Sequence, residues 1–346
     1  MQRSPQALVA APAAFAEAER LEAAGQLLDA IATLSEANRI ERNSGAEEHL
    51  VQLRHEAFAG LDRRTPTDLP PAVTRASGRP GPLPELSPSD LTVETLRAGL
   101  ASHGCVLIRG LVSSDRAAGL VHGIDAALSG FDAGAEGAPT SATTPWYAPF
   151  TPRTGNYRVG GRRKWVRASG AIWTADSPQM LFELLELVDD TGIGALVTEY
   201  LGERPALSAN KCTLRRVPVT SNTDWYQDGA FLGAEVRTLN LWLGLSDCGT
   251  DAPGLDIVPR RLDDVVETGT DGAIFDWAVS PELVARLTED TPVLRPEFAP
   301  GDALLFDHLF LHRTAIGPDM TRERHAIETW FFAPSAYPDG QIPLVY

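Results

Sequence analysis

The spacing of apolar residues divides the chain into a helical front part and a strand-rich back part. Between residues 5 and about 60, alanine and leucine are dense, and Leu21, Leu28, Ile31 and Leu34 follow the 3.6-residue period of an amphipathic helix. We therefore predict an N-terminal helical region, residues 1–62. Because one pair of helices cannot bury its own apolar side, we expect it to pack on the main domain or on a second subunit.

Proline and glycine mark the next boundary. Residues 63–90 are rich in both, which is typical of an extended connector, and the main domain is predicted to follow as residues 91–346. Within it, helical periods and capping residues predict helices over 87–104, 113–128 and 178–200, with a buried strand at Cys105–Leu111. Residues 131–160 carry glycine, proline and aromatic residues and are predicted to form a long loop.

After residue 205 the helical period gives way to short apolar runs separated by turn residues. We predict strands within these runs: 206–219, 237–247, 255–259, 291–300, 302–312 and 325–334. Many short strands after a helical front half predict an α+β protein whose core is a β-sandwich or barrel of the jelly-roll kind.

Composition and charge narrow the classes of partner. The chain has 346 residues and a formal net charge of -16. So acidic a protein is not expected to bind nucleic acid or an anionic membrane. No apolar run is long enough to span a bilayer, and no basic segment followed by an apolar one marks a secretory signal, so we predict a cytoplasmic location. The three cysteines lie in apolar surroundings without a CxxC pair and are expected to be buried thiols.

The candidate chemistry centres on the stretch WYQDGAFLG, residues 225–233. Two histidines and one carboxylate commonly hold Fe(II) and leave positions open for oxygen and a cosubstrate. An H-x-D pair usually supplies two of these ligands, because residues i and i+2 of an extended chain point the same way. Here the loop reads Tyr226-Gln227-Asp228, and the downstream strand after a Pro-Gly-Asp turn reaches His312. Arg324 opens the last strand and is suited to binding a carboxylate through two hydrogen bonds.

Taken in order, the WxQDG loop, NLWLGLSD, APGLDIVPRR, the PGD turn, the distal histidine and the strand-opening arginine resemble the phytanoyl-CoA dioxygenase family. These are oxygenases that depend on Fe(II) and 2-oxoglutarate. The resemblance covers about residues 95–335 and implies a double-stranded β-helix, the cupin-like form of the jelly roll. It also implies Fe(II) and 2-oxoglutarate as cofactors and a small metabolite as substrate.

Carried over residue by residue, the resemblance implies that Asp228 and His312 are iron ligands and that Arg324 binds 2-oxoglutarate. Lys211 and Thr213 are further candidates for binding the cofactor. The remaining candidates are expected to contact the substrate: Trp146, Trp165, Arg215 and Gln227.

The chain departs from the family at Tyr226, where the pattern has a histidine. Three interpretations stay open. Tyr226 replaces the imidazole as a ligand, since a bound cation lowers the pKa of a phenol. Alternatively, His308, Asp224 or water completes the metal shell. In the third interpretation the metal is lost.

Two functions follow from these interpretations. One is an oxygenase with an altered metal shell. The other is a metal-independent descendant of that fold, either a non-redox enzyme with His312 and Tyr226 as acid and base or a ligand-binding protein. A homodimer through the N-terminal helices is a further expectation.

Overall fold

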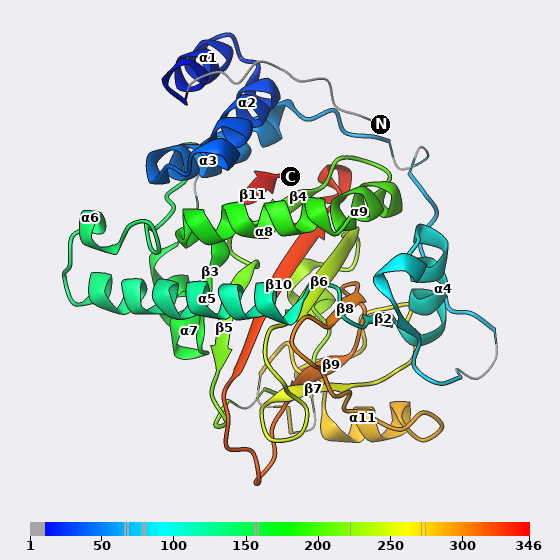
Figure 1. Ribbon diagram of the computed structural model, residues 1–346. Coiled ribbons are helices and arrows are strands. Elements are labelled where there is room, and N and C mark those ends of the chain that lie inside the picture. Colours follow the sequence, from blue (N-terminus) through cyan, green and yellow to red (C-terminus); the bar gives the residue numbers. More distant parts are fainter. Residues whose placement is uncertain are drawn as a thin grey trace.

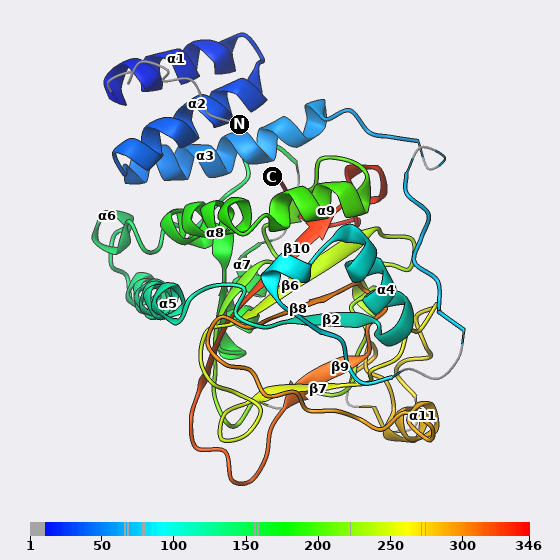
Figure 2. The same cartoon turned by 45° about the vertical axis from the view of Figure 1, so that its right-hand side comes forward.

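Two β-sheets of unequal size face one another in the computed structural model, and helices cover the outer side of the larger sheet (Figure 1, Figure 2). This arrangement confirms the predicted α+β jelly roll with an N-terminal helical region. The structure describes residues 11–65, 67, 69–77, 81–155, 157, 159–221, 223–270, 272–273 and 275–346. Residues 1–10 of the predicted helical region lie outside this part, as do five residues of the connector.

The N-terminal region forms three helices, α1 (Ala11–Ala23), α2 (Leu27–Ile40) and α3 (Ser44–Ala57). Gly25, with a φ of 74°, separates the first two, because this left-handed conformation is easily adopted only by glycine. The side chain of Asn43 accepts a hydrogen bond from the backbone N–H of Ala46 and thereby caps α3.

The helical region shares a core with the main domain. Leu34 and Leu53 are completely buried in a cluster that also contains Phe182 and Val345, which lie more than 100 positions further along the chain. The prediction that these helices pack on the main domain is therefore confirmed. The homodimer stays a prediction, and the apolar face from which it was inferred is already covered within one chain.

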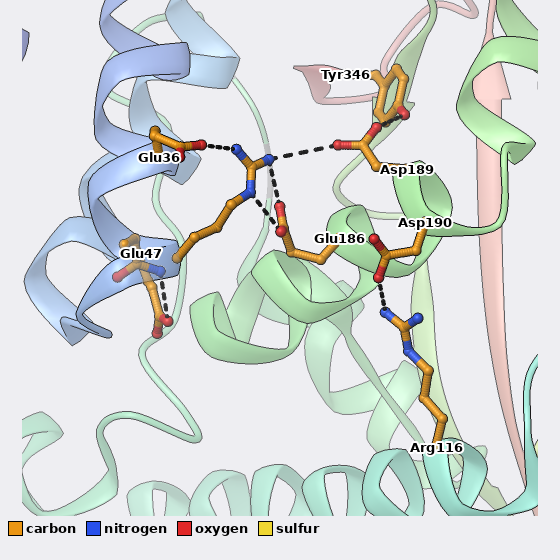
Figure 3. A network of polar contacts seen from close by, with 9 residues as sticks. Glu36, Glu47, Arg116, Glu186, Asp189, Asp190 and Tyr346 are labelled. Carbon is orange, nitrogen blue, oxygen red and sulfur yellow. Dashed lines mark hydrogen bonds and ion pairs between the residues drawn. The ribbon is translucent and has the colours of Figure 1, made fainter. Parts of the chain in front are cut away.

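Ion pairs reinforce this contact at its edge. Arg39 of α2 pairs with Glu36 of its own helix and, at 2.6 Å, with Glu186 of α8 (Pro178–Asp190) (Figure 3). The same guanidinium lies 3.7 Å from Asp189, whose carboxylate accepts a hydrogen bond from the hydroxyl of Tyr346. The network ties the second helix, α8 and the last residue of the chain together (Figure 3).

The other helices of the main domain partly match the prediction. They are α4 (Val93–His103), α5 (Ser114–Ala135), α6 (Thr140–Thr143), α7 (Gly160–Ala168), α9 (Ile193–Leu201), α10 (Gly229–Leu232) and α11 (Pro281–Leu287). The long loop predicted over 131–160 is wrong in part, because α5 runs on to Ala135 and α6 follows. The helix predicted over 178–200 is broken at Gly192, whose φ of 75° ends α8 and starts α9.

The large sheet carries the main core. Its strands are β1 (Glu85–Leu86), β2 (Cys105–Ile108), β3 (Ala171–Trp173), β4 (Ala206–Ser208), β5 (Thr213–Val217), β6 (Thr238–Gly244), β8 (Ala303–Phe306), β10 (Arg324–Phe332) and β11 (Pro343–Val345). Seven of these strands follow the order β1-β2-β8-β6-β10-β4-β11. The other two are β5, which pairs with β10, and β3, which pairs with β5. Strands β6 and β8 are buried along their whole length, as expected for central strands covered on both faces.

The small sheet pairs β7 (Gly254–Ile257) with β9 (His312–Ala315). Isolated bridges extend it on both sides, between Trp225 and Val279, between Tyr226 and His312, and between Ile257 and Leu294. Figure 2 shows this sheet on the side of the large sheet opposite α8 and α9. In the part of the chain that the structure describes, no helix has the length and apolarity needed to cross a membrane.

Candidate active site

The loop 225–228 lies directly beside the start of β9. The backbone N–H of Tyr226 donates to the carbonyl of His312 at 3.0 Å, and the N–H of His312 donates back at 3.1 Å. Asp228, two residues beyond Tyr226, lies close to the same histidine: its Oδ2 is 3.8 Å from His312 Nε2. The structure thus brings together residues that are 84 positions apart, as the sequence predicts.

His312 is held as a neutral imidazole with one nitrogen free. Its Nδ1 lies 3.0 Å from the carbonyl oxygen of Phe310, an acceptor only, so Nδ1 carries the proton and Nε2 has a lone pair facing Asp228. Burial lowers the pKa of His312 to about 4, so Asp228 and His312 do not form a salt bridge at neutral pH. A separation of 3.8 Å is longer than a hydrogen bond and suits one bridging ion or water.

Asp228 is 6% exposed and lies at the start of the short helix α10. Burial raises the pKa of its carboxyl group to about 7, and the nearby ammonium of Lys211 opposes this rise. Burial also lowers the pKa of Lys211 to about 8, against the effect of the carboxylates Asp228 and Glu328. The charge on each of these two groups therefore influences the pKa of the other.

Tyr226 packs its ring on His312, with ring centroids 4.5 Å apart. Its ring also meets the edge of Trp277 at 5.6 Å. Burial, followed by the charge of Asp228, raises the pKa of the phenol well above its ordinary value, so without a bound cation Tyr226 keeps its proton.

Arg324 enters the same interior from the first position of β10. Its guanidinium is 1% exposed and donates from Nη1 to the carbonyl oxygens of Gly254 at 2.8 Å and Pro253 at 3.3 Å. Its Nε has no hydrogen-bond partner, and within the described residues no carboxylate pairs with it. Burial lowers the pKa of Arg324 to about 10, which leaves it charged at neutral pH.

Glu328 is the site residue that the sequence analysis missed. It lies opposite Thr213 in the register of β10 and β5, and its carboxylate accepts hydrogen bonds from Thr213 Oγ1 at 3.1 Å and from Arg215 Nη1 at 2.7 Å. Thr213 and Arg215 thus share one face of the strand, and both bind Glu328. A glutamate among apolar residues in HAIETWFF was the available signal.

For three of the predicted substrate residues, the contacts or exposure that the structure shows do not involve this cluster. The side chain of Gln227 is fully buried, and its amide bonds to the backbone of Asp264, Val266 and Leu309, so it fastens the loop instead. Trp146 packs edge-on against His122, next to Gly123 of α5. Trp165 lies on α7 and is 67% exposed. The predicted role of Gln227 is thus corrected, because all of its polar atoms are occupied by backbone groups.

The described residues do not supply a third conventional metal ligand. Among them, no three His, Cys, Asp or Glu side chains converge as a metal site would require. His308 Nε2 lies 3.1 Å from the carbonyl oxygen of Ala234, which explains why it does not join His312. A groove of about 910 Å³ between α3, α6 and α8 contains none of the candidate residues, so it is separate from this site.

Comparison with known proteins supports the fold. No protein-family model matches the chain, and no curated protein sequence matches it. Among solved structures, EctD from S. alaskensis with 2-oxoglutarate and 5-hydroxyectoine aligns with a TM-score of 0.51 and 17% identity over 80% of this chain and 88% of that chain. The 2-oxoglutarate-dependent carbocyclase SnoK from nogalamycin biosynthesis aligns with a TM-score of 0.46 and 14% identity, over 78% and 100% of the two chains. The match to EctD establishes a shared fold.

Proposed function

We propose that this chain is an enzyme of the Fe(II)/2-oxoglutarate oxygenase type, similar to the phytanoyl-CoA dioxygenase family, that acts on a small metabolite through an altered metal shell. The observation that carries the proposal is the pair His312 and Asp228: a neutral imidazole whose free Nε2 faces a carboxylate oxygen at 3.8 Å. Hydrogen bonding of the other imidazole nitrogen to a backbone carbonyl is the usual way to orient a metal-binding histidine.

Arg324 supports 2-oxoglutarate as cosubstrate. A buried guanidinium without a carboxylate partner is costly, and Arg324 has an unpaired Nε and only carbonyl acceptors. The distal carboxylate of 2-oxoglutarate would supply the missing anion. The guanidinium also lies over the ring of Trp242, 5.3 Å from its centroid, and this contact stabilises its position.

The residues present fit iron less completely than they fit 2-oxoglutarate, because only two conventional ligands are in place. His312 and Asp228 would hold the iron, and Tyr226, whose ring lies 4.5 Å from that of His312, is the candidate for a third ligand. Bound iron and 2-oxoglutarate would supply oxidative chemistry. The chain itself orients the imidazole through Phe310, provides one carboxylate charge through Asp228, and keeps water from the apolar side with Phe306, whose ring lies 4.9 Å from His312.

A metal-independent function is the second candidate, and the position of Tyr226 favours it. Its ring lies against the imidazole, and its phenol keeps the proton. In this form Asp228, with a pKa of about 7, and the unprotonated Nε2 of His312 would hold and transfer a proton at neutral pH. The reaction would then be a non-redox proton transfer, or the pocket would only bind a ligand.

An anaerobic titration of the native protein with Fe(II), with and without 2-oxoglutarate, separates the two candidates. We expect one equivalent of iron to bind and a visible charge-transfer band to appear only when both are present. Calorimetry with 2-oxoglutarate alone measures separately whether Arg324 binds the cosubstrate. Absence of bound iron at millimolar Fe(II) would reject the oxygenase and leave the metal-independent candidate.

A further inference from the structure

Three aromatic side chains extend from the candidate site to the surface, and we name them the aromatic wall: Phe231, Trp277 and Phe275. The rings of Phe275 and Trp277 stack in parallel, 4.7 Å apart with an interplanar angle of 5°. Trp277 meets Phe231 edge-on at 6.1 Å and meets Tyr226 edge-on at 5.6 Å. Since Tyr226 lies on His312, the wall is continuous with the candidate site.

The position of the wall is fixed by the backbone. Val279, two residues after Trp277, donates its N–H to the carbonyl of Trp225 at 2.7 Å, next to Tyr226. Phe231 lies on α10, three residues after Asp228. The two halves of the wall therefore come from separate loops that are both anchored at the residues beside His312.

The outer part of the wall is open to solvent. Phe231 is 37% exposed and Phe275 is 43% exposed. Adjacent large apolar rings on a surface mark a place where a ligand or partner binds, because leaving them in water is unfavourable. Because Phe275 and Trp277 cover each other's facing sides, a flat ligand would stack on an outer face of this pair.

Positive charge lies at the base of the wall in an otherwise acidic protein. The ammonium nitrogen of Lys211 is 3.5 Å from the ring centroid of Phe231. Arg215 is already paired with Glu328 at 2.7 Å, whereas the ammonium of Lys211 lies directly on a ring of the wall and is the cation that a ligand there would meet.

We infer that the substrate is a planar aromatic molecule with an anionic group, such as a carboxylate or a phenolate, which stacks on the wall and directs its charge toward Lys211. This inference rests on the proposed function, because it places the substrate at the mouth of the same site. A flexible aliphatic acid, which would not need parallel rings, is the alternative that the experiment must exclude.

The test is calorimetry on the full chain without metal, using 2-naphthoate and two matched probes. Decahydro-2-naphthoate keeps the charge and loses the aromatic plane, while 2-naphthamide keeps the plane and loses the charge. We expect 2-naphthoate to bind about tenfold more tightly than either probe, as stacking and one charge contact would give. Equal binding of the saturated acid, or no binding of 2-naphthoate, would overturn the inference.

Variants locate the bound molecule. Phe275→Leu and Trp277→Leu should each weaken 2-naphthoate about threefold to tenfold and leave decahydro-2-naphthoate unchanged. Lys211→Met should bring 2-naphthoate to the level of 2-naphthamide. Trp165→Leu, which removes an exposed tryptophan outside the wall, should change nothing. Binding that responds to Trp165 and not to Trp277 would also refute the inference.

The two proposals fail separately. If iron and 2-oxoglutarate bind but 2-naphthoate shows no preference, the aromatic wall has been misinterpreted and the oxygenase proposal stands. If 2-naphthoate binds as expected but iron does not, the substrate class stands and the oxygenase proposal falls.

Discussion

Tyr226 and His312 exchange two backbone hydrogen bonds, of 3.0 and 3.1 Å, and their rings lie 4.5 Å apart. The backbone of residue 226 is therefore fixed beside the histidine whatever side chain it carries. Under the proposed function, the affinity of this site for iron depends on the side chain at 226, because Asp228 and His312 already lie 3.8 Å apart.

Tyr226→His should create or strengthen iron binding. The imidazole would stand on the same fixed backbone and complete a set of two histidines and one carboxylate. We expect the affinity for Fe(II) to rise at least about tenfold, a modest gain for one added ligand. Metal analysis after anaerobic dialysis measures it.

Tyr226→Phe is the matched control, since it removes only the hydroxyl. It should bind iron as the native protein does if the phenol is not a ligand, and lose iron if it is. An unchanged affinity in Tyr226→His would show that residue 226 does not face the metal position.

Arg324→Gln should weaken 2-oxoglutarate binding. The substitution removes a buried charge that has no carboxylate partner in the described chain, and a charged hydrogen bond of this kind is worth about tenfold to a hundredfold in affinity. Calorimetry on the metal-free protein measures it. Arg322→Gln, an exposed neighbour that pairs with Asp251, should leave the affinity unchanged; equal losses in both variants would point to a general effect of charge.

Asp228→Asn should stabilise the protein most at high pH. Burial raises the pKa of Asp228 from 3.8 to about 7, so its contribution to stability is present in full below pH 3.8 and is lost as the pH rises through about 7. We expect the gain in unfolding free energy at pH 8 to exceed the gain at pH 5 by roughly 2 kcal/mol. Urea denaturation at both pH values measures it.

Asp256→Asn is the control for that experiment. Asp256 pairs with Arg295 and Arg313, so its replacement should reduce stability at pH 8. A gain from Asp228→Asn that did not depend on pH would mean that the carboxylate is not the group that titrates.

Glu328→Gln should destabilise the fold. Arg215 would be left beside β10 without its counter-charge, at a cost of about 1–3 kcal/mol for a pair whose side chains are 15% and 18% exposed. Glu323→Gln, on a side chain that is 52% exposed, should have little effect. Similar unfolding free energies for both variants would show that Glu328 is not needed to neutralise Arg215.

Leu53→Ala should destabilise the whole chain, not only the helical region. Leu53 is completely buried in the cluster shared with Phe182 and Val345, and such a cavity costs about 2–5 kcal/mol. One cooperative transition should move to lower temperature. Leu28→Ala, at a residue 37% exposed, should shift it much less; a separate early transition in Leu53→Ala would instead show that the helices unfold alone.

Local patterns were enough to determine the main elements. The helical period around Leu34 and the change to short strands after residue 205 follow from interactions between near neighbours in the sequence, whereas the roles expected for Asp228 and His312 came from the family resemblance. The local patterns predicted the α+β jelly roll, and the order of the motifs along the chain indicated which residues form the candidate site.

Only the tertiary structure decided which side chains pair. The register of β10 with β5 places Glu328 opposite Thr213. Arg215 therefore donates a hydrogen bond to the carboxylate of Glu328 and is not left to bind a ligand. The bridge of Trp225 with Val279 brings Trp277 beside Tyr226, although about 50 residues separate them. Sequence periodicity encodes the local conformation and the buried face of each element, whereas contacts between distant segments depend on the sheet register and on the bridges that join the loops.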